Sequence, residues 1–204
     1  MMGKRKAASA RMKRAFADVL CPVCKYGYVR GLPGEARLHA AFHARYLGQR
    51  KPKREPRLAA FGGDVRVNAS SPKSLQRIVY RCAVELQRDE DFDFPHRGQD
   101  ETWANRRDMH ALVLVESGSI AVGAVAFLRT DWPYCEPGWL MMFAWISDEW
   151  RRRGVMTRRW LSWRKTYGDF TLSSPLSSEM RAFVGKMNAT VDGAVSPTVT
   201  LEEA

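Results

Sequence analysis

The sequence contains no apolar run long enough to cross a bilayer, which takes about 18 consecutive apolar residues. Its basic N-terminus also lacks the apolar segment of about 7 to 15 residues that marks a secretory signal. We therefore expect no membrane partner and an intracellular, reducing location, which is cytoplasmic, or nuclear and chromatin-associated in a eukaryote. In such a compartment, cysteines that are close in sequence are more often metal ligands or free thiols than disulfides.

A second absence concerns catalysis. No Gly-x-Ser-x-Gly sequence is present, which disfavours a serine nucleophile on a strand-to-helix elbow. Acidic residues are in the minority, with 22 Asp and Glu against 33 Lys and Arg, so the formal net charge is +11. This charge favours an anionic partner such as nucleic acid, a nucleotide cofactor or an acidic protein surface. With 45% hydrophobic residues, the 204-residue chain can still fill the core of one ordinary domain and a small appendage.

Four possible metal ligands are present in the first fifty residues. Cys21 and Cys24 are followed by His39 and His43, a C-x2-C-x14-H-x3-H spacing. A close cysteine pair can bind one ion from a tight turn, and histidines four residues apart project from one face of a helix. Such a set suits tetrahedral Zn²⁺ and leaves no position open for water. We therefore predict a structural rather than a catalytic zinc site.

The composition also suggests how the chain is divided. A turn at Pro33-Gly34 should precede a finger helix over residues 35–46, with Tyr26 and Tyr28 covering a very small core. Proline and basic residues then predict an irregular linker. We predict a basic N-terminal arm (1–18), a C2H2 zinc finger (19–47), a basic linker (48–60), a larger α+β domain (61–190) and a C-terminal strand or tail (191–204). The arm is either a nucleic-acid-binding tail or a solvated leader.

The stretch 138–163 gives the main indication of a ligand site in the larger domain. Trp139–Ile146 is an apolar run of the length of a buried strand. A basic loop, 151–156, follows and leads into a helical pattern without a breaker. This order directs free backbone N–H groups and a helix N-terminus to one place, which suits a phosphate group. The alternative is a solvated arginine cluster that caps a strand.

The remaining elements are predicted from periodicity and turn residues. We expect strands over 64–68, 110–116, 119–130 and 169–172, and helices over 72–90 and 176–187. Cys82 lies within the apolar stripe of the first of these helices and should be a buried small side chain. The element order predicts a mixed sheet with helices on its faces.

Two of these motifs resemble a known family. Arg151-x-x-Gly154-x-Met156 after a buried strand resembles the acetyl-CoA pyrophosphate loop of the GNAT N-acetyltransferases, although Met156 stands where that loop has Gly or Ala. The segments CPVCKYGY and HAAFH are similar to the finger that precedes the acetyltransferase domain in Eco/ESCO-type cohesin acetyltransferases. The resemblance implies a GNAT-like α+β fold, with a mostly antiparallel sheet flanked by helices, and acetyl-CoA as cofactor.

The resemblance also implies roles for individual residues. The cofactor-binding residues would be Trp145, Ile146, Ser147, Arg151, Arg152, Arg153, Gly154, Val155 and Met156. In the cohesin acetyltransferases, a Ser-x-Pro-Thr-x-Asp stretch precedes the final helix. On this chain its Ser falls on Ser173, and its Asp, implicated in activity, falls on Ser178. Glu179 is then a candidate general base, and Ser173 and Ser178 would orient water or the leaving thiol. Other candidate bases are Glu136, Glu116, Asp131 and His110.

Together these observations predict an acetyl-CoA-dependent N-acetyltransferase that modifies a lysine of a protein substrate. One alternative is a zinc-finger nucleic-acid-binding or adaptor protein with a degenerate acetyltransferase domain. The net charge, the basic arm and linker, Met156 and Ser178 favour it. A second alternative is an acetyltransferase that acts on a small amine.

Overall fold

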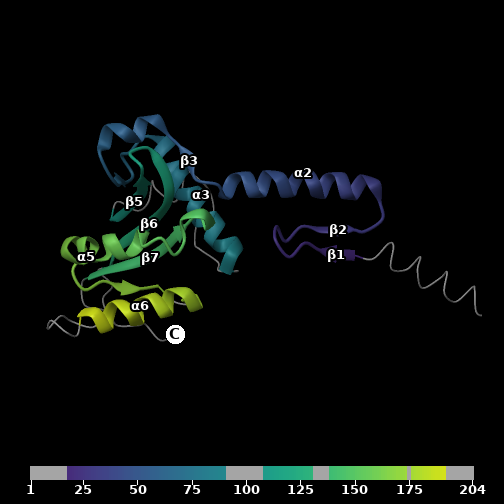
Figure 1. Ribbon diagram of the computed structural model, residues 1–204. Coiled ribbons are helices and arrows are strands. Elements are labelled where there is room, and N and C mark those ends of the chain that lie inside the picture. The colour runs from purple at the N-terminus through teal and green to yellow at the C-terminus, as the bar shows by residue number, and fades with distance from the viewer. Residues whose placement is uncertain (1–17, 91–107, 131–137, 174–175, 192–204) are drawn as a thin grey trace, which may run out of the picture. The chain divides into compact units, whose positions relative to one another are not determined.

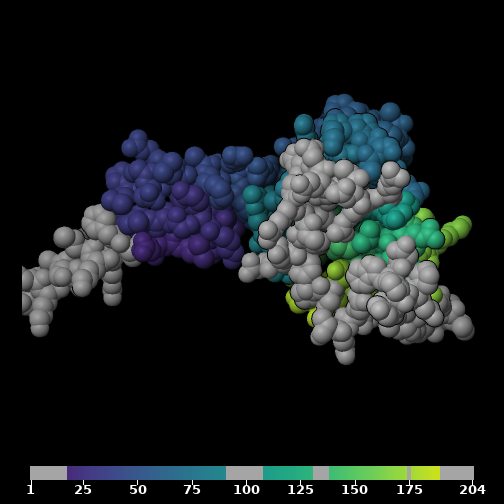
Figure 2. All heavy atoms as spheres, turned by 180° about the vertical axis from the view of Figure 1, so that it is seen from behind, coloured from purple at the N-terminus to yellow at the C-terminus, as the bar shows by residue number. Residues whose placement is uncertain are grey.

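The computed structural model describes residues 18–90, 108–130, 138–173 and 176–191, which are coloured in Figure 1 and Figure 2. The chain forms two compact units, residues 1–51 and 52–204. The predicted basic arm, apart from Asp18, lies outside the described residues, as do the candidate bases Asp131 and Glu136 and the predicted C-terminal strand. Within the described part of the chain, no helix combines the length and the apolar character that a membrane span requires.

The first unit is a short hairpin followed by one helix. Strands β1 (Asp18–Leu20) and β2 (Gly27–Val29) pair antiparallel, and helix α2 (Pro33–Arg50) follows. The predicted turn at Pro33-Gly34 is wrong, because Pro33 opens the helix, where its missing N–H has no helical partner to lose. The helix also continues four residues beyond Tyr46.

The first unit has a very small core. Cys21, Cys24 and Tyr46 are buried, with Tyr26 and Tyr28 packed against them. The aromatic cover predicted from the two tyrosines is therefore confirmed. No further apolar side chain of residues 18–51 is buried, and Leu38 on α2 is 58% exposed.

The second unit is built on a mostly antiparallel sheet. Its strands are β4 (Val65–Val67), β5 (Met109–Glu116), β6 (Ile120–Thr130), β7 (Gly138–Ile146) and β8 (Thr171–Leu172), which are neighbours in that order. The β7–β8 pair is parallel, the other pairs are antiparallel, and a short strand β3 (Lys53–Arg54) pairs with β6. The predicted α+β class, with a mostly antiparallel sheet flanked by helices, is confirmed.

Helices cover both faces of this sheet (Figure 1). Helix α3 (Lys73–Glu90) packs its apolar stripe, including the buried Cys82, against Val113 and Trp145. Helices α5 (Val155–Tyr167) and α6 (Ser178–Val191) lie with the opposite face. That side has an aromatic core built from Phe127, Trp160, Trp163, Tyr167 and Phe170.

Most of the predicted linker has regular structure. After the end of α2, β3 joins the sheet, and a 3-10 helix η1 (Pro56–Phe61) follows. Pro56 stands at the start of η1, where its fixed φ suits a helical turn. Leu58 is fully buried in the α3-side core, so the segment belongs to the second unit. The prediction of an irregular linker over 48–60 is therefore wrong in these parts.

Arg159 on α5 ties three elements together. Its guanidinium forms two hydrogen bonds with the carboxylate of Asp64, of 2.6 and 2.9 Å, and one of 2.7 Å with Glu116. It also donates to the carbonyl oxygens of Val115 and Val155. With 14% of the side chain exposed, this is a partly buried network.

We expect Arg159→Met to lower the free energy of unfolding by about 3 kcal/mol, because it leaves two partly buried carboxylates without their shared cation. Urea unfolding followed by circular dichroism measures the change. Arg158→Met is the matched control, since Arg158 is 52% exposed and pairs with Glu116 alone among carboxylates in the described residues. Its loss should not exceed about 1 kcal/mol. Equal losses in the two variants would contradict this role.

The pH dependence of the Arg159→Met effect gives a second check. Burial would raise the pKa of Glu116, but hydrogen bonds from Arg159 and Arg158 outweigh it and lower that pKa. A carboxylate of this kind contributes stability above its unfolded pKa of about 4.3, and the contribution is lost as the pH falls through the folded pKa. The difference between wild type and Arg159→Met should therefore shrink on acidification below about pH 4.3.

Candidate functional site

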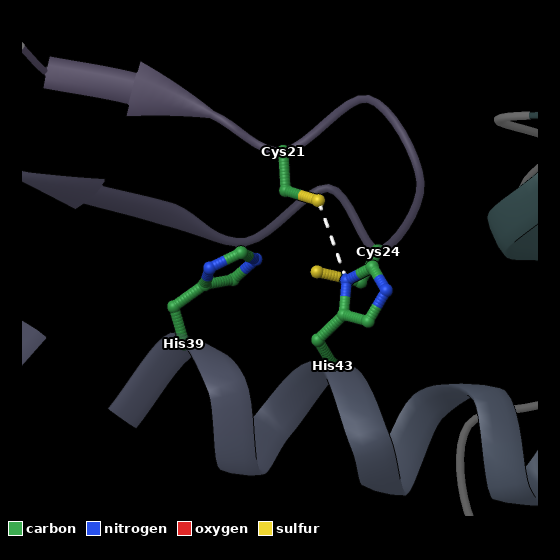
Figure 3. Close-up of side chains that lie close together, drawn as sticks. All are labelled: Cys21, Cys24, His39 and His43. Carbon is green, nitrogen blue, oxygen red and sulfur yellow. Dashed lines mark hydrogen bonds between the residues drawn. The ribbon is translucent and has the colours of Figure 1, made fainter. Parts of the chain in front are cut away.

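Cys21, Cys24, His39 and His43 converge in the first unit (Figure 3). The cysteines lie on the loop between β1 and β2, and the histidines project from consecutive turns of α2. Their donor atoms all lie within 4.8 Å of one another, and the Cys21 sulfur is 3.5 Å from His43 Nδ1. Two backbone hydrogen bonds, Cys21 N–H to the Tyr26 carbonyl and Lys25 N–H to the Cys21 carbonyl, fix the cysteine loop.

The surroundings of this cluster fit a metal ion. Nε2 of His39 is buried and has no hydrogen-bond partner among the described residues, so it is available as a ligand. The ring of Tyr28 stacks on that of His39 with 4.2 Å between centroids, which holds the imidazole in place. A hydrogen bond from the Cys24 backbone lowers the pKa of Cys21 to about 6 against the effect of burial. Two sulfur and two imidazole donors form the set that tetrahedral zinc accepts.

The basic loop of the second unit makes a tight turn between β7 and α5. Arg152 has φ 60° and Gly154 has φ 73°, so two residues lie in the left-handed region. Gly154 is the N-cap of α5 and provides no side-chain cap. The first helical hydrogen bond runs from Arg158 N–H to the Gly154 carbonyl, which leaves the N–H groups of residues 155–157 without an intrahelical partner.

The side chains around this turn differ in how far they are exposed to solvent. Val155 is buried, and Met156 packs against the α5-side core, while Arg152 and Arg153 are exposed. Arg153 also lies over the ring of Trp150 at 5.4 Å. The large side chain of Met156 is thus accommodated by the apolar core, and the loop backbone has two exposed arginines beside it.

The side chain of Arg151 is held by hydrogen bonds and ion pairs with other residues of the protein. Its guanidinium donates to the carbonyl of Ile146 at 2.9 Å and to the carboxylate of Asp89 at 2.7 Å, and it pairs with Asp148. Asp89 also accepts from the indole N–H of Trp145 at 3.2 Å. Arg151 therefore joins the end of β7 to the end of α3.

Strands β7 and β8 run side by side over two residue pairs. Leu140 pairs with Thr171 and Met141 with Leu172, and the Ser173 N–H then donates to the Met141 carbonyl. Strand β7 continues to Ile146 without β8 beside it. At this point β7 also has a bulge, because Phe143 pairs with Ala126 and Met141 with Phe127.

A small cavity, partly open to solvent, lies where these strands separate. Residues 141–144 of β7 form one wall, and the chain from Leu172 to Ser173 forms another. Helices α3 and α6 complete it with Leu86, Glu90 and Met180, together with Leu176 and Ser177 before α6. The cavity is thus at an edge of the sheet, between the helices of its two faces.

The backbone of β7 beside this cavity differs from the prediction. Trp145 pairs with Ala124, and the Ser147 N–H donates to the Val122 carbonyl at 2.8 Å, so both residues direct their backbone toward β6. Because alternate residues of a strand face opposite sides, Ala144 and Ile146 direct theirs away from β6. The Arg151 contact with the Ile146 carbonyl agrees with this. The N–H groups of Trp145 and Ser147, predicted to bind the cofactor, therefore face β6, while the backbone of Ala144 and Ile146 faces away from it.

Of the three predicted catalytic residues, one is part of the cavity lining. Ser173 lines the cavity. Ser178 and Glu179 lie exposed at the start of α6, where the Ser178 hydroxyl donates to the Glu179 carboxylate at 2.9 Å. Hydrogen bonds from its own backbone N–H and from Ser178 lower the pKa of Glu179, which makes it a weaker base.

Two further candidate bases are also placed elsewhere. His110 lies against Arg66, with 2.6 Å from a guanidinium nitrogen to Nδ1, and beside the Trp139 ring. Burial and the charge of Arg66 lower the pKa of His110. Glu116 is held by Arg158 and Arg159. Neither residue lines the cavity.

Glu90 is the acidic residue that sequence reasoning missed. It is the last residue of α3 and lines the cavity opposite β7. Burial, Glu179 and Asp89 raise its pKa, against the effect of Arg151. In the sequence, Glu90 is one of several acidic residues around the end of the predicted helix, and nothing in its spacing distinguishes it from the others.

In the comparisons with known proteins, the chain is similar to solved structures but matches no sequence family or curated protein. Solved structures similar to the chain include an aminoglycoside acetyltransferase from an uncultured soil metagenomic sample (15% identity, 69% of this chain and 94% of that one, TM-score 0.41). The xEco2 acetyltransferase domain bound to a K105-CoA conjugate is 13% identical, with 59% and 82% covered and a TM-score of 0.44. A possible acetyltransferase from Clostridium difficile 630 is 9% identical, with 70% and 97% covered and a TM-score of 0.45.

Proposed function

We propose that the protein is an acetyl-CoA-dependent N-acetyltransferase. The observation that carries this proposal is the separation of β7 and β8, together with the glycine turn that leads from β7 into α5. The parting opens a cavity beside the backbone of β7, and the turn offers N–H groups for a phosphate. One extended ligand with an acyl group at one end and a pyrophosphate at the other matches both features.

Different residues of the second unit would bind different parts of such a ligand. The N–H groups at the start of α5 and the exposed Arg152 and Arg153 would bind the pyrophosphate. The backbone of Ala144 and Ile146, directed away from β6, would bind the pantetheine arm or the thioester oxygen. The acyl group would enter the cavity beside Ser173. Holding the thioester in one orientation lowers the entropic barrier to attack by an amine.

Arg151 has a different role in this proposal from the predicted one. Its guanidinium occupies the Ile146 carbonyl and the Asp89 carboxylate, so it positions the end of β7. A pantetheine amide that uses the Ile146 carbonyl would take over this acceptor from Arg151. Arg151 would then be free to turn toward the pyrophosphate.

The acceptor we propose is an amine, and specifically a lysine of a protein substrate. Glu90, at the cavity, and the exposed Glu179 at the start of α6 interact electrostatically and provide negative charge for an approaching ammonium group. A lysine side chain has the reach to enter the cavity while its backbone stays outside. Nucleic acid stays a proposed partner of the basic arm and of the basic segment at 48–60.

In the first unit we propose a structural Zn²⁺ held by Cys21, Cys24, His39 and His43. The convergence of the four donors and the unpartnered Nε2 of His39 support it. All four positions of a tetrahedral ion would be taken by protein ligands, so the ion would supply stability and no chemistry.

The cofactor proposal predicts that acetyl-CoA binds the purified full chain and that Gly154→Trp weakens binding at least tenfold. A side chain at this position is strained because φ is 73°, and its Cβ would lie 3.3 Å from the Arg158 guanidinium. It would also cover the N–H groups at the start of α5. Isothermal titration calorimetry with acetyl-CoA measures both dissociation constants.

Gly62→Trp is the matched control for this titration. Gly62 has φ 68°, so the backbone strain is the same, but it ends η1 and is not part of the proposed site. Its affinity for acetyl-CoA should stay within twofold of wild type. No heat with the wild-type chain, or equal binding by Gly154→Trp, would refute the proposed cofactor site.

A further inference from the structure

The described lining of the cavity between β7 and β8 has one titratable group. The other side chains that line it are aliphatic, aromatic, thioether or hydroxyl groups. Glu90, at the end of α3, lines the same cavity as the β7 bulge at Met142. A thioester placed along β7 would therefore have one carboxylate close to it.

Among the described residues, Glu90 does not form the hydrogen bonds or ion pairs that occupy its acidic neighbours. Asp89 accepts hydrogen bonds from Arg151 and Trp145, and Glu179 accepts one from Ser178. Glu85, on the same helix, is 1% exposed and pairs with Arg88. Glu90, by contrast, is exposed at the residue level and lines the cavity, so an amine arriving from solvent can reach it.

The surroundings of Glu90 raise the pKa of its carboxyl group, which favours proton transfer to it. Partial burial and the negative charges of Glu179 and Asp89 favour its neutral form, and Arg151 opposes them. The carboxylate also ends a helix, where the dipole disfavours negative charge. A carboxylate with a raised pKa is a stronger base than an ordinary exposed one, which suits it to accept a proton from an ammonium group.

We propose that Glu90 is the proton acceptor for the substrate amine, an inference that rests on the proposed acetyl transfer. Its carboxylate takes one proton from the ammonium group, and the neutral nitrogen attacks the thioester carbonyl. The new C–N bond forms, the C–S bond breaks, and the thiolate leaves as the tetrahedral intermediate collapses. The extra proton on the new amide nitrogen passes to the thiolate, and Glu90 returns its proton to water.

The kinetic test uses the full chain, acetyl-CoA and poly-L-lysine as the amine probe. Glu90→Gln should lower kcat about 10²-fold or more, with acetyl-CoA affinity unchanged within twofold by calorimetry. The acidic limb of the kcat/KM profile, which reports the free base, should disappear. Glu90→Asp should recover part of the loss, and Glu149→Gln, a surface glutamate of η2 (Asp148–Trp150), should behave as wild type.

A second measurement does not depend on the amine probe. In a chain labelled with ¹³C at glutamate side-chain carboxyls, the resonance lost in Glu90→Gln should titrate at a higher pH than those of exposed glutamates and move when acetyl-CoA is added. An ordinary titration with no response to bound acetyl-CoA would overturn the proposal. So would full activity of Glu90→Gln, or a loss confined to Glu179→Gln. Failure of the wild-type chain to bind acetyl-CoA would instead refute the proposed function.

Discussion

Removal of the proposed zinc ion should unfold residues 18–51 and leave the second unit folded. In this first unit the apolar core consists of Cys21, Cys24 and Tyr46, with two partly buried tyrosines. A segment of about 40 residues or fewer does not usually bury enough apolar surface to fold alone. Binding of structural Zn²⁺ contributes on the order of 10 kcal/mol in such modules, so its loss exceeds any stability that the tyrosines provide.

Hydrogen exchange followed by mass spectrometry measures this effect. After treatment with 1,10-phenanthroline, amides of α2 should exchange within seconds, while those of β5, β6 and β7 stay protected. The elemental analysis of the untreated chain should give about one zinc per molecule, in keeping with one four-ligand site.

Cys24→Ser should reproduce the chelated state without chelator, because a serine hydroxyl does not replace a thiolate ligand. Cys82→Ser is the matched control, since Cys82 is a buried cysteine of α3 in the α3-side core of the second unit. It should keep the metal and the protection of α2, even if it lowers the stability of the second unit. A metal-free chain with protected α2 amides would contradict the zinc proposal.

Gly123→Ala should lower the free energy of unfolding of the second unit by about 3 kcal/mol, the upper part of the usual range for overpacking. A Cβ at Gly123 would lie 2.2 Å from the Trp145 carbonyl oxygen and 3.0 Å from the Ile146 Cα. Both are backbone atoms, so no side-chain rotation relieves the contact, and β6 and β7 must separate. For a unit of this size, the melting temperature should fall by about 6–12 °C.

The same substitution should weaken acetyl-CoA binding, because the shifted residues of β7 include Ile146, whose backbone faces the proposed cofactor site. Differential scanning calorimetry and the acetyl-CoA titration measure the two effects. Gly185→Ala is the control: it lies in α6 with open space around its Cβ position, and alanine there should stabilise the helix by up to about 1 kcal/mol. A fully stable Gly123→Ala would show that the two strands can move apart at no cost.

Much of the secondary structure could be predicted because its signals are local. The apolar stripe of α3, the hairpin of β5 and β6 around Ser117-Gly118, and the stop of α5 at Gly168 each depend on residues close in sequence. Helical and strand periodicities of 3.6 and 2 residues encode these elements directly. The positions at which the prediction failed, such as η1, are those where a distant core decides the structure. Leu58 is buried in a core made by α3 and the sheet, whose residues are distant in sequence.

The positions of the candidate catalytic residues depend most on the tertiary structure. Glu179 was chosen because it stands next to the position of a family aspartate, but among the described residues it is not part of the cavity lining. Glu90 lies about fifty residues before the β7 wall that it faces, and no spacing rule joins them. The same holds for Arg159, whose bond to Asp64 joins residues 95 positions apart.

The sequence by itself determined the cluster of two cysteines and two histidines, the glycine turn after a buried strand and the basic character of the chain. Each depends on residue type and short spacing, which hold whatever the rest of the chain does. Only the tertiary structure decided which face of β7 directs its backbone outward, where β8 leaves it, and which carboxylate lines the resulting cavity. These depend on strand register and on the packing of helices from distant parts of the chain, and one residue of register reverses every side chain and backbone group of a strand.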